Sequence, residues 1–421
     1  MPGPLHGYRV VDLTAMVSGP QATMLLADQG ADVTKVENPR GGDHTRGHPN
    51  RRGGLSAAFL NNNRSKRSIA IDLKDARGVE TLRRVAAGCD VFVQNFRPGV
   101  AERLGLGEAA IRDVSPDVVY VSISGFGERG PYAARPVYDP LVQALSGLAS
   151  IQGGADDARP RLVRTIVPDK LTGMVAAQAI TAALLARTRT GEGQHVRVSM
   201  LDAVIAFLWG SDMSAQTLVG DEPPQTRAAS FIDLIYETAE GWLSVAVQSD
   251  REWAALAGAL GRAEWLDDPR FRTPALRQEH IDERLAVTQE ALLERTAADW
   301  LERLDAADVP CAPVLTRGEL ASHPQVRASA IVIESDHPRA GRLRQARPAA
   351  RFSVTSPEPS GGAPVLGADT DAILAETGHS PEEIRTLRAA GIVGTSDDGC
   401  GNDGGDGDDG GNGDERGEAS R

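Results

Sequence analysis

The chain has 421 residues and a formal net charge of −13, with 41% hydrophobic and 4% aromatic residues. This length exceeds what one hydrophobic core usually serves, so two domains are expected. The negative charge and the scarcity of aromatic side chains argue against nucleic acid or an anionic membrane surface as a partner.

The cysteines and the N-terminus indicate a reducing compartment. Cys89, Cys311 and Cys400 lie far apart and form no CxxC pair, so neither a zinc site nor a disulfide framework is expected. Residues 1–6 lack a signal-peptide pattern, and no apolar run approaches the roughly 20 residues that a membrane-spanning helix needs. The sequence therefore predicts a cytoplasmic protein without a metal.

The first elements along the chain form a strand–helix–strand unit. An apolar strand at 8–13 is followed by a helix that opens at Gly19-Pro20 and ends at Gly30, and a second strand covers 32–37. The loop at 14–20 is not GxGxxG, which argues against a nicotinamide cofactor. The start of this helix could receive a phosphate, or Gly19-Pro20 could simply begin a helix.

Strands and helices continue to alternate. We expect strands at 68–73, 90–96 and 117–124 and a helix at 76–87, which together predict a parallel sheet with helices on both faces. In such an α/β fold, ligands bind at the carboxyl ends of the strands. The glycine-containing loop at 40–47 is basic, and it is either a solvated loop or an anion-binding one.

Asp169 stands between two predicted elements. An apolar run at 162–167 predicts a strand, and residues 170–187 predict a helix rich in small residues. Aspartate at such a point is most often an N-cap that accepts a hydrogen bond from a free helix N–H, and the local sequence favours this interpretation. The alternative is that the positive end of the helix keeps Asp169 ionised as a nucleophile.

Beyond residue 219 the pattern changes. A linker at 220–229 precedes a predicted hairpin at 231–248, and helices follow up to 304. We therefore divide the chain into a large α/β domain at 1–219, a small α+β domain with its linker at 220–329, a return to the large domain at 330–394, and a tail at 395–421. The tail carries nine acidic and two basic residues among glycines and is predicted to be disordered.

The ordered set of motifs resembles the family III CoA-transferases, a group that includes formyl-CoA transferase and carnitine CoA-transferase, with α-methylacyl-CoA racemase as a sister branch. The resembling stretches cover nearly all of residues 7–205. They are Val10-Val11-Asp12-Leu13, Gly19-Pro20, Gly30-Ala31-Asp32-Val33-Thr34-Lys35-Val36-Glu37, Gly42-Asp43, Arg46-Gly47, Lys66-Arg67-Ser68-Ile69 continuing to Lys74, Gln94-Asn95-Phe96-Arg97-Pro98-Gly99, Leu104-Gly105, Ser124-Gly125-Phe126-Gly127, Tyr138-Asp139 and Gly191-Glu192-Gly193-Gln194.

The resemblance implies a Rossmann-like large domain with an inserted smaller α+β domain, in an interlocked homodimer. It also implies that the substrates are an acyl-CoA and a small carboxylic acid, and that Asp169 attacks the thioester. A carboxylate suits this task because it can form first an anhydride and then a thioester with CoA, whereas serine or cysteine would carry only the acyl group. The CoA contacts that the resemblance implies are Lys74, Asn95, Phe96, Arg103 and Arg46.

Some positions depart from the family pattern. Val17 stands where formyl-CoA transferase has glutamine, Asn38 stands where it has arginine, and its glycine-rich active-site loop is not evident here. These departures favour an acyl group that is larger or less polar than formyl or oxalyl.

Two other functions stay open from the sequence. The racemase branch exchanges a proton with an aspartate and a histidine, but the Gly-His-Asp triplet of that branch is Val137-Tyr138-Asp139 here, which favours transfer over racemisation. A non-enzymatic CoA-binding protein would use Lys74 and Asn95 and have no need of Asp169. The sequence does not name the donor or the acceptor acid.

Overall fold

The computed structural model describes residues 3–154, 159–220 and 234–394. The chain divides into two compact units. The first unit comprises Met1–Ser146, Arg164–Ala206 and Glu334–Arg421, and the second comprises Gly147–Val163 and Phe207–Ile333. The predicted linker from residue 221 and the predicted disordered tail from residue 395 lie outside the described residues.

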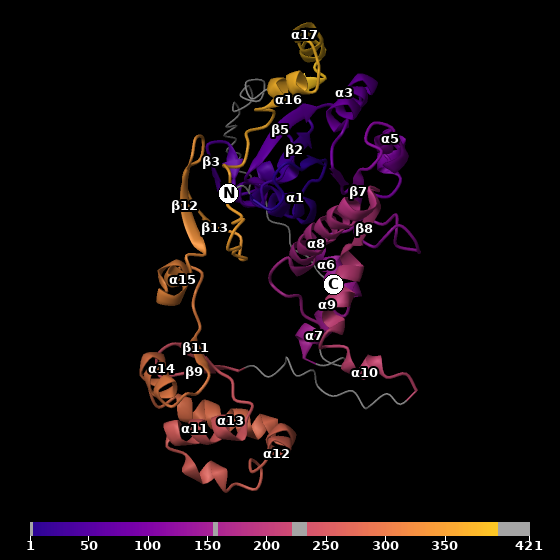
Figure 1. The fold of residues 1–421 in the computed structure, drawn as a ribbon. Coiled ribbons are helices and arrows are strands. Elements are labelled where there is room, and N and C mark those ends of the chain that lie inside the picture. The colour runs from indigo at the N-terminus through magenta and orange to yellow at the C-terminus, as the bar shows by residue number, and fades with distance from the viewer. Residues whose placement is uncertain (1–2, 155–158, 221–233, 395–421) are drawn as a thin grey trace, which may run out of the picture. The chain divides into compact units, whose positions relative to one another are not determined.

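A seven-stranded sheet forms the centre of the first unit, with the order β14-β5-β2-β1-β6-β7-β8 (Figure 1). All neighbouring strands run parallel except β14, which pairs antiparallel with β5. This confirms the parallel sheet predicted from the sequence. The strands are β1 Arg9–Asp12, β2 Asp32–Glu37, β5 Lys66–Ile71, β6 Val91–Gln94, β7 Val119–Ser124, β8 His195–Ser199 and β14 Val393–Gly394.

Helices cover both faces of this sheet, because its central strands carry apolar side chains toward both sides. One core joins the sheet to the α3 and α5 segments and to the C-terminal helices, and the other joins it to α1 and α8. The helices of the first unit are α1 Ser18–Asp28, α2 Ala57–Asn63, α3 Ala76–Ala86, α4 Val100–Arg103, α5 Glu108–Arg112, α6 Asp139–Leu145, α8 Val167–Thr190, α16 Thr370–Glu376 and α17 Pro381–Ala389.

Helices α1 and α8 pack closely because small residues line their contact. A Cβ atom at Gly173 would lie 2.8 Å from the carbonyl oxygen of Ser18, so only glycine fits there. By length and composition α8 could also cross a membrane. Residues along one side of this helix, including Ala176, Ile180 and Leu184, are buried in the core with α1 and the sheet.

The start of α8 corrects two predictions. Residues 162–166 form no strand, because no neighbouring strand pairs with them, and the helix begins at Val167. Ile166 is the N-cap, and Pro168 occupies the first turn, where its missing N–H does no harm. Asp169 therefore lies inside the first turn of α8, and the prediction that it is the N-cap is wrong.

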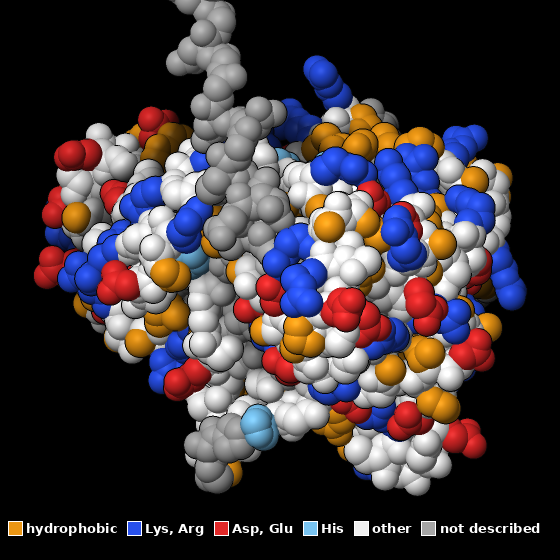
Figure 2. Space-filling model, turned by 90° about the horizontal axis from the view of Figure 1, so that it is seen from above, with side chains coloured by type: hydrophobic (Ala, Val, Ile, Leu, Met, Phe, Trp, Pro, Cys, Tyr) orange, Lys and Arg blue, Asp and Glu red, His pale blue; other side chains and the backbone are white. Residues whose placement is uncertain are grey.

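Short hairpins and helices complete the chain. They are β3 Arg51–Arg52 with β4 Leu55–Ser56, β12 Val332–His337 with β13 Gly341–Ala346, α9 Met200–Trp209 and α15 Pro324–Ser329. On the face of the molecule in Figure 2, lysine and arginine side chains are interspersed with acidic ones. This mixture is typical of a solvated surface and does not resemble the basic track of a nucleic-acid-binding protein.

The second unit has its own core. The hairpin predicted there is present as β9 (Ile235–Glu237) and β10 (Trp242–Val245), and β11 (Cys311–Pro313) adds a third antiparallel strand. Trp253 stacks on Trp265 with ring centroids 5.6 Å apart, and Trp300 is buried beside them. The helices of this unit are α7 Leu148–Gly153, α10 Ser214–Thr217, α11 Asp250–Leu260, α12 Pro274–Glu279, α13 Ile281–Leu292 and α14 Ala297–Ala306.

Candidate active site

Asp169 lies in a cavity of about 230 Å³ within the first unit. The loop after β1 contributes Met16, the start of α1 contributes Ser18, and the loop after β6 contributes Asn95 and Phe96. Residues from the end of β7 onward close another side of the cavity. The cavity is therefore at the carboxyl ends of neighbouring parallel strands, where the sequence predicted a ligand site.

The Asp169 carboxyl group has an altered acidity. Burial, followed by the negative charge of Asp139, raises its pKa from 3.8 to about 6, while hydrogen bonds from the backbone and hydroxyl of Ser18 act in the opposite direction. The expected effect of the helix N-terminus is thus outweighed by burial and by a like charge. At pH 7 a group of pKa 6 is still about nine-tenths ionised, and it is more basic than an ordinary aspartate.

Asp139 is the carboxylate next to Asp169, and the sequence did not single it out as a site residue. It begins α6, and its Oδ2 accepts a hydrogen bond of 3.3 Å from the backbone N–H of Asp169. Its Oδ1 accepts a 2.7 Å hydrogen bond from Gln143, which fixes the carboxylate in place. The sequence showed Asp139 only as part of the Tyr138-Asp139 motif and gave it no role, because its proximity to Asp169 arises from tertiary packing.

Replacing Asp139 with asparagine should shift the pH profile of the enzyme. Removal of the like charge lowers the pKa of Asp169, so the carboxylate stays ionised at lower pH and the acidic limb of kcat/KM moves down from about pH 6. The profile should be measured from pH 4.5 to 8 with Asp113→Asn, an exposed acid outside the cavity, as the control. An acidic limb at the same pH in Asp139→Asn and wild type would refute this electrostatic role.

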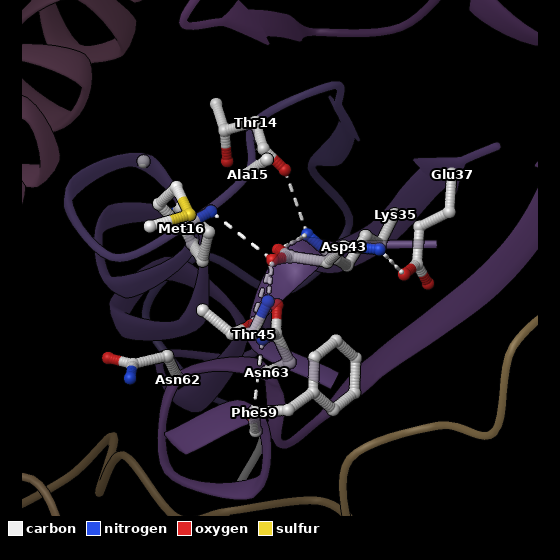
Figure 3. Close-up of polar contacts among 12 residues, drawn as sticks. Thr14, Ala15, Met16, Lys35, Glu37, Asp43, Thr45, Phe59, Asn62 and Asn63 are labelled. Atoms are coloured by element: carbon white, nitrogen blue, oxygen red, sulfur yellow. Dashed lines mark hydrogen bonds and ion pairs between the residues drawn. The ribbon is translucent and has the colours of Figure 1, made fainter. Parts of the chain in front are cut away.

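A buried ion pair holds the loop that carries Met16 and leads into α1 (Figure 3). Lys35 Nζ donates a 2.8 Å hydrogen bond to the Thr14 carbonyl oxygen and lies 3.0 Å from Asp43 Oδ2, and both side chains are almost fully buried. Asp43 Oδ1 in turn accepts from the backbone N–H of Met16 at 3.3 Å. Met16 has a φ of +73°, a strained conformation for a non-glycine residue that these contacts maintain.

Two of the predicted CoA contacts have other partners. The Asn95 side chain donates to the Ala15 carbonyl oxygen at 2.8 Å and accepts from the Ala15 N–H at 3.0 Å, so it fastens the same loop. Arg46 is buried, with Nε and Nη2 at 2.8 and 2.6 Å from the Glu37 carboxylate and its guanidinium over the Phe59 ring. The structure therefore places Arg46 in the interior and not on a ligand-binding surface.

The remaining predicted contacts divide between two places. Lys74 and Phe96 line a second, mostly apolar cavity of about 300 Å³, together with Leu73 and Leu104. Phe96 also lines the Asp169 cavity, so the two cavities share a wall. Arg103 ends α4 and lines neither cavity.

Comparison with known proteins identifies the family of this chain. The family model described as CoA-transferase family III matches residues 5–370. The chain belongs to CoA-transferase family III. This confirms the resemblance seen in the sequence and the enzyme class that it implied, an acyl-CoA:carboxylate CoA-transferase.

Proteins named as CoA-transferases match almost the whole chain. A succinyl-CoA:glutarate CoA-transferase of Mus musculus is 34% identical over 93% of this chain and 90% of its own length. A formyl-CoA:oxalate CoA-transferase of Escherichia coli is 32% identical over 92% of this chain and 99% of its own length. The crystal structure of a CAIB/BAIF family protein from Brucella suis aligns with a TM-score of 0.79 and 31% identity over 90% of this chain and all of that one.

Racemisation would need a histidine that acts as a second base at the Asp169 cavity of this CoA-transferase. None is among the described residues that line it. His195 lines a neighbouring cavity, but its Nε2 is 2.8 Å from Ser122 Oγ and its Nδ1 is 2.7 Å from Glu108 Oε2. Both ring nitrogens are thus engaged, which disfavours the two-base reaction of the racemase branch. Across residues 3–154, 159–220 and 234–394, no group of three or more possible ligands is placed to hold a metal ion.

Proposed function

We propose that this CoA-transferase moves CoA from an acyl-CoA donor to a small free carboxylic acid, with Asp169 as the covalent carrier. The observation that supports it is a half-buried carboxylate with a pKa of about 6, held by Ser18 and facing a cavity at the carboxyl ends of the strands. Such a carboxylate is ionised at neutral pH and more nucleophilic than an ordinary aspartate.

The first half of the proposed reaction loads the enzyme. An Asp169 oxygen attacks the thioester carbonyl carbon, the carbon–sulfur bond breaks, and CoA leaves as the thiolate, which produces a mixed anhydride. The thiolate then attacks the Asp169 carbonyl carbon, and the donor acid departs as a carboxylate. The product is an aspartyl-CoA thioester.

The second half repeats these steps in reverse with a different acid. The acceptor carboxylate attacks the Asp169 thioester and displaces the thiolate, and the thiolate then attacks the acceptor carbonyl carbon of the new anhydride. Asp169 is released as a carboxylate. No proton is gained or lost over the cycle, so the site needs positioning and exclusion of water more than a general acid.

CoA itself would extend from the Asp169 cavity, past Phe96, into the second cavity that Phe96 also lines. The apolar lining beside Lys74 suits the flat adenine group, while the ammonium group of Lys74 suits a phosphate. Arg103 precedes Leu104, which lines this cavity, and its guanidinium group would bind a phosphate at the edge of the cavity. We also propose the interlocked homodimer that the resemblance implies, so that a particle of twice 44.5 kDa is expected in sedimentation experiments.

Trapping of the intermediate tests the proposed function. The enzyme is incubated with an acyl-CoA donor without any acceptor, digested with trypsin and mapped by mass spectrometry. CoA, or a hydroxamate after treatment with hydroxylamine, is expected on the peptide 165–170, and the Asp169→Ala variant should bind CoA without labelling. Transfer activity in Asp169→Ala, or CoA attached to a different residue, would show that the carrier is wrong.

A further inference from the structure

Two arginines of the Asp169 cavity have no acidic partner among the residues that the structure describes. Arg97 and Arg135 are exposed and line the same cavity as Asp139 and Asp169. Other guanidinium groups of the first unit, such as that of Arg64, lie against carboxylates. Among the described residues, no acidic side chain is within ion-pair distance of Arg97 or Arg135, so both can bind an anion that enters the cavity.

Arg135 is held in a defined orientation. Its guanidinium carbon lies 3.9 Å from the centroid of the Tyr132 ring. Tyr132 packs edge-on against Phe126, with ring centroids 5.4 Å apart, and Phe126 lines the cavity. Stacking of this kind restrains the guanidinium plane and leaves its N–H groups at the edge available for a carboxylate.

The arrangement separates two kinds of charge within one cavity. In the proposed function, on which this inference rests, the reacting carboxyl carbon must be next to Asp169, and Asp139 adds a second negative charge there. A second carboxylate on the same acid would be repelled by this end and attracted by the arginines. Guanidinium groups bind carboxylates through two parallel hydrogen bonds.

We propose that this enzyme selects acids that carry two carboxylates, and that Arg135, assisted by Arg97, binds the carboxylate that does not react. The arginines are then specificity-determining residues, and they also turn the substrate so that its other carboxylate faces Asp169. A monocarboxylic acid of the same length lacks this anchor and leaves both guanidinium groups unpaired.

The test compares two acceptors of equal length, glutarate and pentanoate, with one donor that has no free carboxylate. For wild type, kcat/KM should be roughly 10- to 100-fold higher for glutarate, since a charge-assisted hydrogen-bonded pair contributes that much. Arg135→Met should remove most of this ratio by lowering only the glutarate value, and Arg97→Met should remove part of it. Arg135→Lys should be intermediate, because lysine keeps the charge without the planar fork.

The control is Arg189→Met, an exposed arginine at the opposite end of α8 from Asp169, which should leave both acceptors unaffected. A wild-type enzyme without preference for glutarate, or an unchanged ratio in Arg135→Met and Arg97→Met, would overturn the inference. An equal loss for both acids would also overturn it and would indicate that Arg135 binds a CoA phosphate.

These outcomes are separate from the test of the carrier. Loading of CoA onto Asp169 from the donor alone requires no acceptor, so Arg135→Met should still be labelled on the peptide 165–170. If wild type is not labelled there, the proposed function fails; if wild type and Arg135→Met are labelled but acceptor preference is absent, only the inference on dicarboxylates fails.

Discussion

Asp169→Asn should abolish CoA transfer while making the folded protein more stable. An amide cannot attack the thioester, and loss of a catalytic nucleophile typically lowers kcat by about 10⁴-fold or more. Because the folded state raises the pKa of Asp169 from 3.8 to about 6, ionisation of this group destabilises the fold. The neutral variant should therefore gain up to about 3 kcal/mol in the free energy of unfolding near pH 7.5.

The gain in stability of Asp169→Asn should depend on pH in a defined direction. A carboxyl group with a raised pKa in the folded state weakens the fold as pH increases from about 4 to 6, and the full effect remains above that range. The gain in Asp169→Asn should thus be present at pH 7.5 and almost absent at pH 4. Urea unfolding followed by far-ultraviolet circular dichroism at both values measures it.

The same experiment tests whether burial of its charge governs the contribution of Asp169 to stability. If the hydrogen bonds from Ser18 stabilised the carboxylate by more than its burial costs, the variant would instead be less stable. A catalytic aspartate yields a more stable and inactive one, in keeping with the usual trade-off between activity and stability. Asp113→Asn, outside the cavity, should change neither quantity, and calorimetry should show unaltered CoA binding in Asp169→Asn.

Lys35→Met should destabilise the first unit and impair catalysis. Lys35 is fully buried between Asp12, Asp43 and the Thr14 carbonyl oxygen, and its removal leaves Asp43 as a buried charge without its partner. Breaking such a pair costs about 3–5 kcal/mol. The loop that leads to Ser18 at the start of α1 should become more mobile as well, so kcat should fall by roughly 10-fold or more while KM for the acyl-CoA changes little.

A double-mutant cycle separates the pair from general damage to the core. Asp43→Asn removes the charge that Lys35→Met leaves unpaired, so the double variant should lose less stability than the two single variants together. The five tryptophans, at positions 209, 242, 253, 265 and 300, all belong to the second unit, so their fluorescence does not report on Lys35. Hydrogen exchange of the β1 and β2 amides is the suitable probe, and additive losses would contradict the pairing.

The sheet could be predicted from the sequence because parallel strands with two buried faces appear as short apolar runs, as in Val91–Gln94 and Val119–Ser124. The apolar run before Asp169 appeared similar, yet it forms no strand because the sheet offers it no partner. Strand pairing is a tertiary property, and local hydrophobicity does not reveal it.

Only those site residues that belong to recognisable sequence motifs could be predicted from the sequence. Asp169 was proposed from the ordered motifs around it, and the structure places it in a cavity. Asn95 and Arg46 were assigned to CoA, but their polar groups bind Ala15 and Glu37, which no periodicity would connect with them. The role of Asp139 depends on a contact with Asp169, 30 residues away in sequence. The availability of Arg135 depends on its having no acidic partner among the described residues, which is a tertiary property.

The absence of a side chain at Gly173 limits how this enzyme can be altered. Any larger residue there would push α1 away from α8 and carry Ser18 away from Asp169, which lies one helical turn before Gly173. Directed evolution toward new acids should therefore succeed at the rim, around Tyr132 and Arg135, where side chains can be exchanged without moving a helix. By contrast, Asp169 and the Ser18 groups that donate hydrogen bonds to it cannot be changed independently, because the contact between α1 and α8 fixes both.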